Sequence, residues 1–167
     1  MKLFIRALGR EAESRAAALS AGRGGETDTL YFGGGTPSML SDTHLGRLME
    51  TLDRLVPVDK LDEFSFEANP ATFTEKKVRF WRSLGMTRVS LGVQSLDSGI
   101  LRLLGREHTP DQALRSVEML KNAGMPHINM DLMFAIPGQP LSIWEATLKE
   151  AVRAGTDHIC LLYTSDA

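Results

Sequence analysis

Apolar positions along the chain follow two different periods. Short apolar runs typical of strands lie at residues 29–32, 63–67, 88–93, 128–134 and 157–161. Between these runs, apolar residues recur every three or four positions, which predicts amphipathic helices with one buried face. Helices are expected at residues 2–20, from Ser41 or Asp42 to near Pro57, and at 74–85, 97–104, 109–124 and 140–154. The pattern therefore predicts five β-α steps.

This alternation of strands and helices indicates an α/β fold with a parallel sheet. Parallel neighbours need crossover connections, which are nearly always right-handed. The chain contains no GxxxxGK[ST] phosphate loop, and no GxGxxG follows the first strand. A dinucleotide-binding doubly wound sheet is therefore the weaker option, because that fold carries its glycine fingerprint there.

Composition limits the class of protein. With 167 residues, 43% hydrophobic and 24% charged, the chain suits one globular domain with a sizeable core. A formal net charge of -2, with acids and bases mixed, gives no basic face for nucleic acid. No apolar run is long enough to span a bilayer, and residues 1–22 lack the apolar centre of a signal peptide. A single cysteine, Cys160, fits a reducing cytoplasm.

Three consecutive glycines, residues 33–35, directly follow the first predicted strand. Without side chains, their backbone N–H and C=O groups can approach a ligand closely and adopt positive φ without strain. Pro37 then ends the strand. A lone GGG is explained equally well by a tight turn that binds no ligand, so the sequence around the glycines has to decide between the two interpretations.

Five sequence blocks supply that context: FGGGTPSML at 32–40, FEANP at 66–70, RVSLGVQSLD at 88–97, LGREH at 104–108 and NMDLMFAIPGQ at 129–139. In this order they resemble the radical S-adenosylmethionine proteins of the oxygen-independent coproporphyrinogen III oxidase family, especially its HemW-type heme-chaperone branch. The resemblance implies a partial (β/α)6 barrel, truncated at both ends, whose radical S-adenosylmethionine core covers residues 1–159. The motif residues then lie at strand carboxyl ends, where barrel active sites gather.

The same resemblance implies that S-adenosylmethionine contacts seven residues: Gly34, Gly35, Thr36, Glu67, Gln94, Arg106 and Asp131. Glu67 would pair with the ligand's ammonium or a ribose hydroxyl, and Gln94 would contact ribose or carboxylate. Arg106 would bind a carboxylate, and Asp131 would bond ribose or balance Arg106 in a structural ion pair. The alternative is that these strand-end residues are solvated or purely structural and contact no ligand. His108 is expected to be a packed or capping residue, with contact to substrate or porphyrin as the alternative that the resemblance implies, and no catalytic residue is assigned.

The family resemblance also implies a [4Fe–4S] cluster held by a CxxxCxxC loop after the first barrel strand. That motif is absent here. We therefore expect the chain to be a fragment without that strand and loop, and to have no metal ligands of its own. Residual S-adenosylmethionine binding is compatible with this view, whereas reductive cleavage to a 5′-deoxyadenosyl radical is not expected.

Residues 160–167, CLLYTSDA, match one reading frame of a transposon adapter used in sequencing libraries. We therefore expect this octapeptide to be a non-native tail and Cys160 to be no ligand.

Three function classes remain open. The first is an enzyme that decarboxylates the propionates of coproporphyrinogen III by radical chemistry. The second, which we favour from the glycine-loop and DLMFAIPGQ blocks, is a HemW-type chaperone that carries heme to an acceptor protein. The third is an unrelated barrel enzyme whose glycine loop holds a phosphate. The first two imply porphyrin or heme as a bound molecule, and the sequence does not separate them.

Overall fold

A computed structural model describes residues 2–22 and 28–163. Its helices are α1 Lys2–Gly22, α2 Asp42–Leu52, α3 Glu75–Ser83, α4 Ser98–Leu103, α5 Pro110–Asn122 and α6 Leu141–Ala154. Its strands are β1 Thr29–Phe32, β2 Glu63–Ala68, β3 Arg88–Gln94, β4 His127–Phe134 and β5 His158–Tyr163. Two short 3₁₀ turns, Pro37–Met39 and Val58–Lys60, complete the described elements. None of the described helices is long and apolar enough to cross a membrane.

The five strands form one parallel sheet in the order β1-β2-β3-β4-β5. The order never reverses, in contrast to a doubly wound sheet, in which strand order reverses at a switch point. A sequential parallel order is the arrangement of a β/α barrel wall. The prediction of parallel β-α steps and the preference for a barrel are therefore confirmed.

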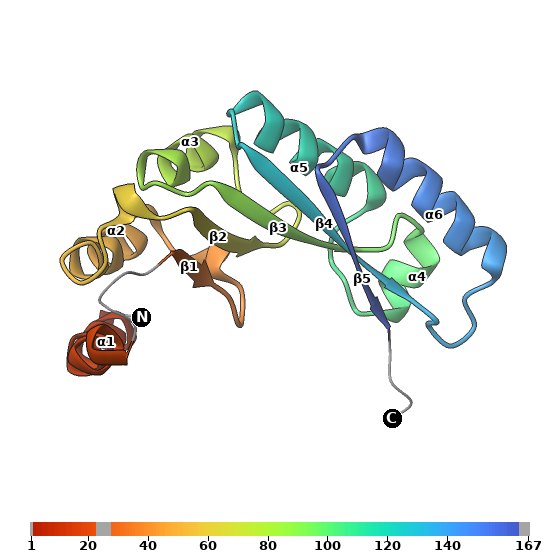
Figure 1. Cartoon of the computed structure of the whole chain (residues 1–167). Helices are drawn as coiled ribbons and strands as arrows, with labels where there is room; N and C mark the ends of the chain where they lie inside the picture. Colours follow the sequence, from red (N-terminus) through yellow and green to blue (C-terminus); the bar gives the residue numbers. More distant parts are fainter. Residues whose placement is uncertain (1, 23–27, 164–167) are drawn as a thin grey trace.

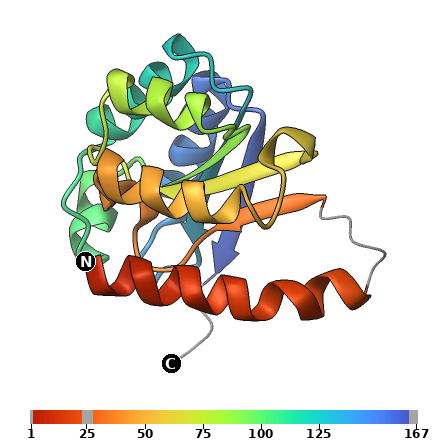
Figure 2. The same cartoon turned by 90° about the vertical axis from the view of Figure 1, so that its left-hand side faces the viewer.

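The sheet is curved, and helices α2, α3, α5 and α6 lie along its outer side (Figure 1). Helix α1 lies at the end of the arc nearest β1 and runs beside α2 (Figure 2). The inner side of the curved sheet carries no helix layer of this kind. Any groups that the inner side presents are consequently accessible from within the arc.

The alternation of side chains along each strand explains this arrangement. On β3, Val89, Leu91 and Val93 are fully buried in the core beneath the helices. The residues between them, such as Ser90 and Gly92, point to the other face, because successive side chains alternate in a strand. One face of the sheet is thus an apolar core and the other presents polar groups.

Local capping signals explain where several helices begin. The Thr109 side chain accepts a hydrogen bond from the backbone N–H of Gln112, and the Gln112 side chain accepts one from the backbone N–H of Thr109. Helix α5 therefore begins with a capping box. Ser41 and Thr74 cap α2 and α3 in the simpler way. These starts agree with the sequence prediction.

One helix end differs clearly from the prediction. Helix α2 stops at Leu52 instead of near Pro57. The Asp53 side chain accepts a hydrogen bond from the backbone N–H of Val58 at 3.2 Å, which closes a turn where a helix would need continued i to i-4 pairing. The other strands and helices begin and end within about two residues of their expected limits, as is usual for element boundaries.

The predicted non-native tail is only partly described. Cys160–Tyr163 belong to β5 and pair with β4, whereas residues 164–167 lie outside the described residues. Cys160 is exposed. The foreign origin of this octapeptide stays a prediction.

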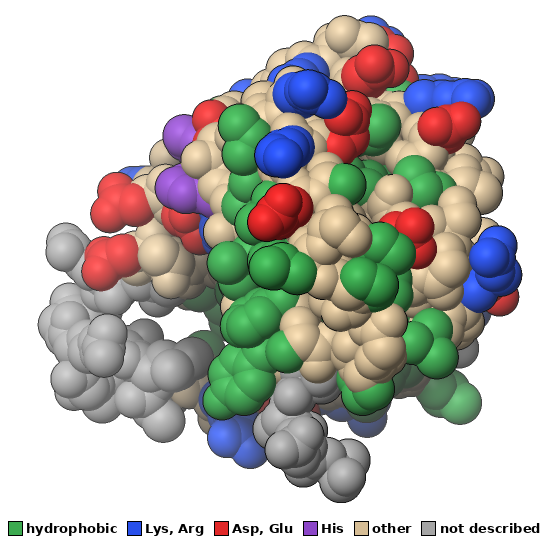
Figure 3. Space-filling view, turned by 90° about the vertical axis from the view of Figure 1, so that its right-hand side faces the viewer, with side chains coloured by type: hydrophobic (Ala, Val, Ile, Leu, Met, Phe, Trp, Pro, Cys, Tyr) green, Lys and Arg blue, Asp and Glu red, His purple; other side chains and the backbone are tan. Residues whose placement is uncertain are grey.

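The outer edge of β5 is expected to cause self-association. Within the described chain β5 pairs only with β4, and its Leu161, Leu162 and Tyr163 are 49%, 45% and 68% exposed. Hydrophobic side chains gather on this side of the molecule (Figure 3). Unpaired strand edges with apolar side chains template association. Sedimentation should therefore show concentration-dependent oligomers that Leu161→Lys reduces, whereas Leu103→Lys, at an exposed position of α4, leaves them unchanged. A chain that stays monomeric contradicts this expectation.

Candidate functional site

A cavity of about 330 Å³ lies where β1 to β4 reach their carboxyl ends. Its lining includes six of the seven predicted residues: Gly35, Thr36, Glu67, Gln94, Arg106 and Asp131. The rest of the cavity lining consists of six residues, namely Pro37, Ala68, Asn69, Ser90, Gly92 and Leu162. The volume falls within the usual range for small-molecule sites, about 300–1,000 Å³. Residues from five separate sequence blocks therefore meet at one place.

The seventh predicted residue, Gly34, contributes differently. Its backbone N–H donates to Glu67 Oε2 at 3.0 Å, so it holds a cavity carboxylate without lining the cavity. Gly34 and Gly35 have φ values of +82° and +63°, and a Cβ on either would meet nothing within 4 Å. Backbone conformation, not lack of space, is what calls for glycine at these two positions.

Glu67 is held at two points. In addition to the bond from Gly34, its Oε1 accepts a short hydrogen bond from the Tyr31 hydroxyl. This bond is the main reason that the pKa of Tyr31 is raised to about 12, since losing the phenolic proton would place two negative charges together. Tyr31 therefore remains a donor over the physiological pH range and fixes the Glu67 carboxylate.

Arg106 spans two strands from the loop after α4. Its Nη2 donates to Asn69 Oδ1 and to the Gly92 carbonyl, both at 2.7 Å. A Cβ at Gly92 would lie 3.0 Å from Asn69 Oδ1 and 3.2 Å from Arg106 Nη2, so glycine makes room for this junction. Burial lowers the pKa of Arg106 below its ordinary value. The anticipated ion pair with Asp131 is not formed among the described residues.

Gln94 ends β3 in a left-handed conformation, with φ of +66°. A non-glycine residue in this region is uncommon and costs free energy. Its Oε1 is buried and has no hydrogen-bond partner among the described residues. Because a buried polar atom normally has a partner, this amide is suited to a ligand that would complete its bonding.

Asp131 is the second carboxylate of the cavity. It accepts hydrogen bonds from Ser90 Oγ at 2.9 and 3.0 Å and from Asn129 Nδ2 at 2.6 Å. Burial raises the pKa of Asp131 above its ordinary value of 3.8, and the nearby charge of Glu67 acts in the same direction. Two carboxylates facing one cavity favour a ligand that carries positive charge.

His108 lies outside this arrangement. It is 8% exposed, and its Nε2 lies 3.1 Å from the Val93 carbonyl oxygen. Burial lowers the pKa of His108, which favours the neutral ring. The expectation that His108 is a packed residue is confirmed.

Sequence reasoning missed three polar residues that organise the site. Asn69 links Arg106 to Thr36, whose Oγ1 accepts from Asn69 Nδ2 at 3.2 Å. Ser90 and Asn129 are paired across β3 and β4, and both bond Asp131. Asn69 stood in the quoted FEANP block. Ser90 and Asn129 were detectable as polar residues at alternate positions within otherwise apolar strands.

The donor set of this chain does not fit an iron–sulfur cluster. Such clusters are held by several cysteine thiolates, and the sequence has one cysteine. Within residues 2–22 and 28–163, no group of three or more His, Cys, Asp or Glu side chains could hold a metal ion.

Comparison with known proteins agrees with this geometry. A Radical SAM superfamily profile matches residues 9–151. The heme chaperone HemW of Lactococcus lactis is 36% identical over 133 residues, 80% of this chain and 35% of that protein. HemW of Bacillus subtilis is 35% identical over 131 residues, 78% of this chain and 35% of that protein.

A solved structure matches over nearly the whole chain. Coproporphyrinogen III oxidase HemN from Escherichia coli, a Radical SAM enzyme, superposes with a TM-score of 0.87 at 27% identity. The match covers 99% of this chain and 38% of that one. The chain spans about a third of the length of the curated relatives it matches. The family profile, the relatives above 30% identity and the shared fold place this chain in the Radical SAM superfamily.

Proposed function

We propose that the cavity at the strand ends binds S-adenosylmethionine. The observation that carries this proposal is that Glu67, Gln94, Arg106 and Asp131, from four distant blocks, line one cavity beside a glycine loop. Family membership supports the same ligand. The six residues that line the cavity are proposed to contact the ligand, and Gly34 is proposed to act indirectly, by holding Glu67.

The charges of the cavity match those of this ligand. S-adenosylmethionine carries an ammonium and a sulfonium, which the Glu67 and Asp131 carboxylates would stabilise. Its carboxylate needs donors, and Arg106 uses only Nη2 in its bonds to Asn69 and Gly92. Guanidinium has five N–H donors, so the remaining ones are suited to a carboxylate. Gln94 Oε1 would accept from a ribose hydroxyl.

The iron–sulfur cluster that the family implies is proposed to be held by residues other than those of this chain, which has one cysteine. When bound, such a cluster supplies the electron that cleaves S-adenosylmethionine. The residues described here would contribute binding and orientation of the ligand. The 167-residue chain alone is proposed to bind without catalysing cleavage.

At the level of the whole protein, we propose a HemW-type heme chaperone. The observation in its favour is the 36% identity to HemW of Lactococcus lactis. Heme would be the cargo and a heme-acceptor protein the partner, in the cytoplasm. The second candidate is an oxygen-independent coproporphyrinogen III oxidase, favoured by the close superposition on HemN. Chimeras in which this chain replaces the matching segment of each relative would distinguish the two candidate functions, because heme transfer and propionate decarboxylation are measured in separate assays.

Glu67→Gln is expected to weaken S-adenosylmethionine binding about ten-fold to one-hundred-fold, since it removes a charge-assisted contact worth about 1.5–3 kcal/mol. Saturation-transfer NMR on the 167-residue chain suits the weak affinity expected without a cluster. Glu63→Gln, at the opposite end of β2, is the matched control and should bind like the unchanged chain. Equal binding by both variants would contradict the assignment of the cavity.

A further inference from the structure

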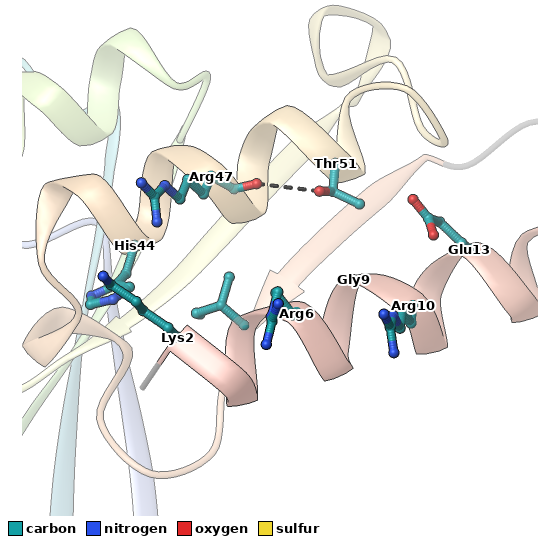
Figure 4. Close-up of a pocket in the computed structure, with 9 residues that line it drawn as sticks. Lys2, Arg6, Gly9, Arg10, Glu13, His44, Arg47 and Thr51 are labelled. Atoms are coloured by element: carbon teal, nitrogen blue, oxygen red, sulfur yellow. Dashed lines mark hydrogen bonds between the residues drawn. The ribbon is translucent and has the colours of Figure 1, made fainter.

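A second cavity, of about 500 Å³, lies between α1 and α2, away from the strand ends. Its cationic lining consists of Lys2, Arg6 and Arg10 from α1 and Arg47 from α2, and His44 also lines it (Figure 4). Ile5 and Gly9 are buried between the helices and form its floor together with Thr51. The residues described for the strand-end site take no part in it.

The glycine in α1 explains how this cavity forms. A Cβ at Gly9 would lie 3.3 Å from Thr51 Cγ2, closer than ordinary van der Waals contact. Glycine is unfavourable inside a helix, so its presence here is explained by the close approach of α1 to α2. The approach places cations of both helices around a common hollow.

The charges of this hollow are not balanced within the protein. None of Lys2, Arg6, Arg10 and Arg47 forms an ion pair with a carboxylate among the described residues. The lining contains one acid, Glu13, so four cations and one carboxylate leave three net positive charges. This local excess contrasts with the overall charge of -2.

The position of the cations in α1 adds to this excess. Positions 2, 6 and 10 recur every four residues, so the like charges are neighbours on one side of the helix and repel one another. The first turn of α1 contains no acidic residue, although the positive end of a helix dipole favours anions there. Both effects are unfavourable in the isolated chain and would be relieved by a bound anion.

We infer that the cavity between α1 and α2 binds a small polyphosphate, a chain of linked phosphate groups. The row of three cations spans about 12 Å along α1, eight residues at 1.5 Å each, which exceeds the reach of one phosphate. A chain of several phosphates would contact that row and Arg47 at once, with a charge that balances the lining. Arginine forks and lysine are the usual donors to phosphate oxygens.

Two details of the site fit such a ligand. His44 Nδ1 is bonded to the Ser41 hydroxyl at 2.7 Å, and its Nε2 has no partner among the described residues. Arg47 is exposed and uses its carbonyl, not its guanidinium, in the bond from Thr51 Oγ1. The Arg47 guanidinium can therefore turn to a ligand without breaking existing bonds, and so can His44 Nε2 in the tautomer whose Nδ1 accepts from Ser41.

The test is calorimetric titration of the 167-residue chain with sodium tripolyphosphate near physiological ionic strength, where unspecific surface attraction is screened. One site is expected, with orthophosphate binding about ten-fold more weakly because it contacts fewer cations. The double variant Arg6→Gln/Arg47→Gln should lose about ten-fold or more in affinity, the loss expected for charge-assisted bonds.

The matched control is Arg54→Gln/Arg102→Gln, which removes the same charge from exposed arginines outside the cavity. It should bind like the unchanged chain. Arg10→Gln serves as an independent third variant, and circular dichroism verifies that each variant is folded. Absence of tripolyphosphate binding, or an equal loss in the control, overturns the inference. Displacement of tripolyphosphate by a polyglutamate peptide at lower concentration would instead assign the cavity to an acidic protein partner, and would also overturn it.

Discussion

Asp131→Asn is expected to weaken S-adenosylmethionine binding about ten-fold to one-hundred-fold, from loss of a charged contact worth about 1.5–3 kcal/mol. The same variant should be more stable than the unchanged chain at pH 7. Burial raises the pKa of Asp131, so the fold disfavours the ionised carboxylate. Asparagine can still accept from Ser90 and Asn129 without that charge. Binding and stability are therefore expected to move in opposite directions.

The pH dependence provides a separate measurement of this effect. A carboxyl group with a raised pKa binds a proton more readily in the folded chain than in the unfolded one, so its contribution to stability falls as pH rises through that window. The advantage of Asp131→Asn in unfolding temperature should consequently shrink as the pH is lowered toward 3.8. Ser65→Ala is a control that changes no charge, and Ser65 lies on the same face of β2 as Glu67. An advantage that does not vary with pH would contradict the explanation by burial.

Trp81→Ala is expected to reduce the free energy of unfolding by about 3–5 kcal/mol, the usual cost of removing a large aromatic side chain from a core. Trp81 is 0% exposed, and its ring centroid lies 4.8 Å from Phe66 and 5.2 Å from Phe73. The cavity left by alanine would lie beneath β2, next to the residue that precedes Glu67. Urea unfolding followed by circular dichroism measures this loss.

Trp81→Phe separates volume from polarity at the same position. The indole Nε1 is buried and has no partner among the described residues. Phenylalanine removes that N–H, whose desolvation costs about 1–3 kcal/mol, and this gain offsets part of the lost packing. Its loss in unfolding free energy should thus be well below that of Trp81→Ala. Equal losses would contradict this expectation, because phenylalanine fills much of the space that alanine leaves empty.

The sequence by itself determined the order and type of the elements. Each strand and helix was detectable because its period of two or about 3.6 residues is a local property. The helix starts at Ser41, Thr74 and Thr109 depend on equally local signals and were predicted at these residues, whereas the part of Gln112 in the capping box was seen only in the structure. The site candidates came from the resemblance of five sequence blocks to a known family, and their expected place at strand carboxyl ends agreed with where barrel active sites gather. The predicted end of α2 was wrong, because the segment after Leu52 turns and is closed by the hydrogen bond from the Val58 N–H to the Asp53 side chain.

The tertiary structure decided which of these side chains meet. Arg106 bonds Asn69 and Gly92 instead of Asp131, because strand register and the loop after α4 set its reach. Ser90 and Asn129 joined the site through the pairing of β3 with β4, which no local pattern encodes. The cationic cavity likewise depends on the approach of α1 to α2 at Gly9. Contacts between residues far apart in sequence follow from packing and register, and local periodicity contains no information about either.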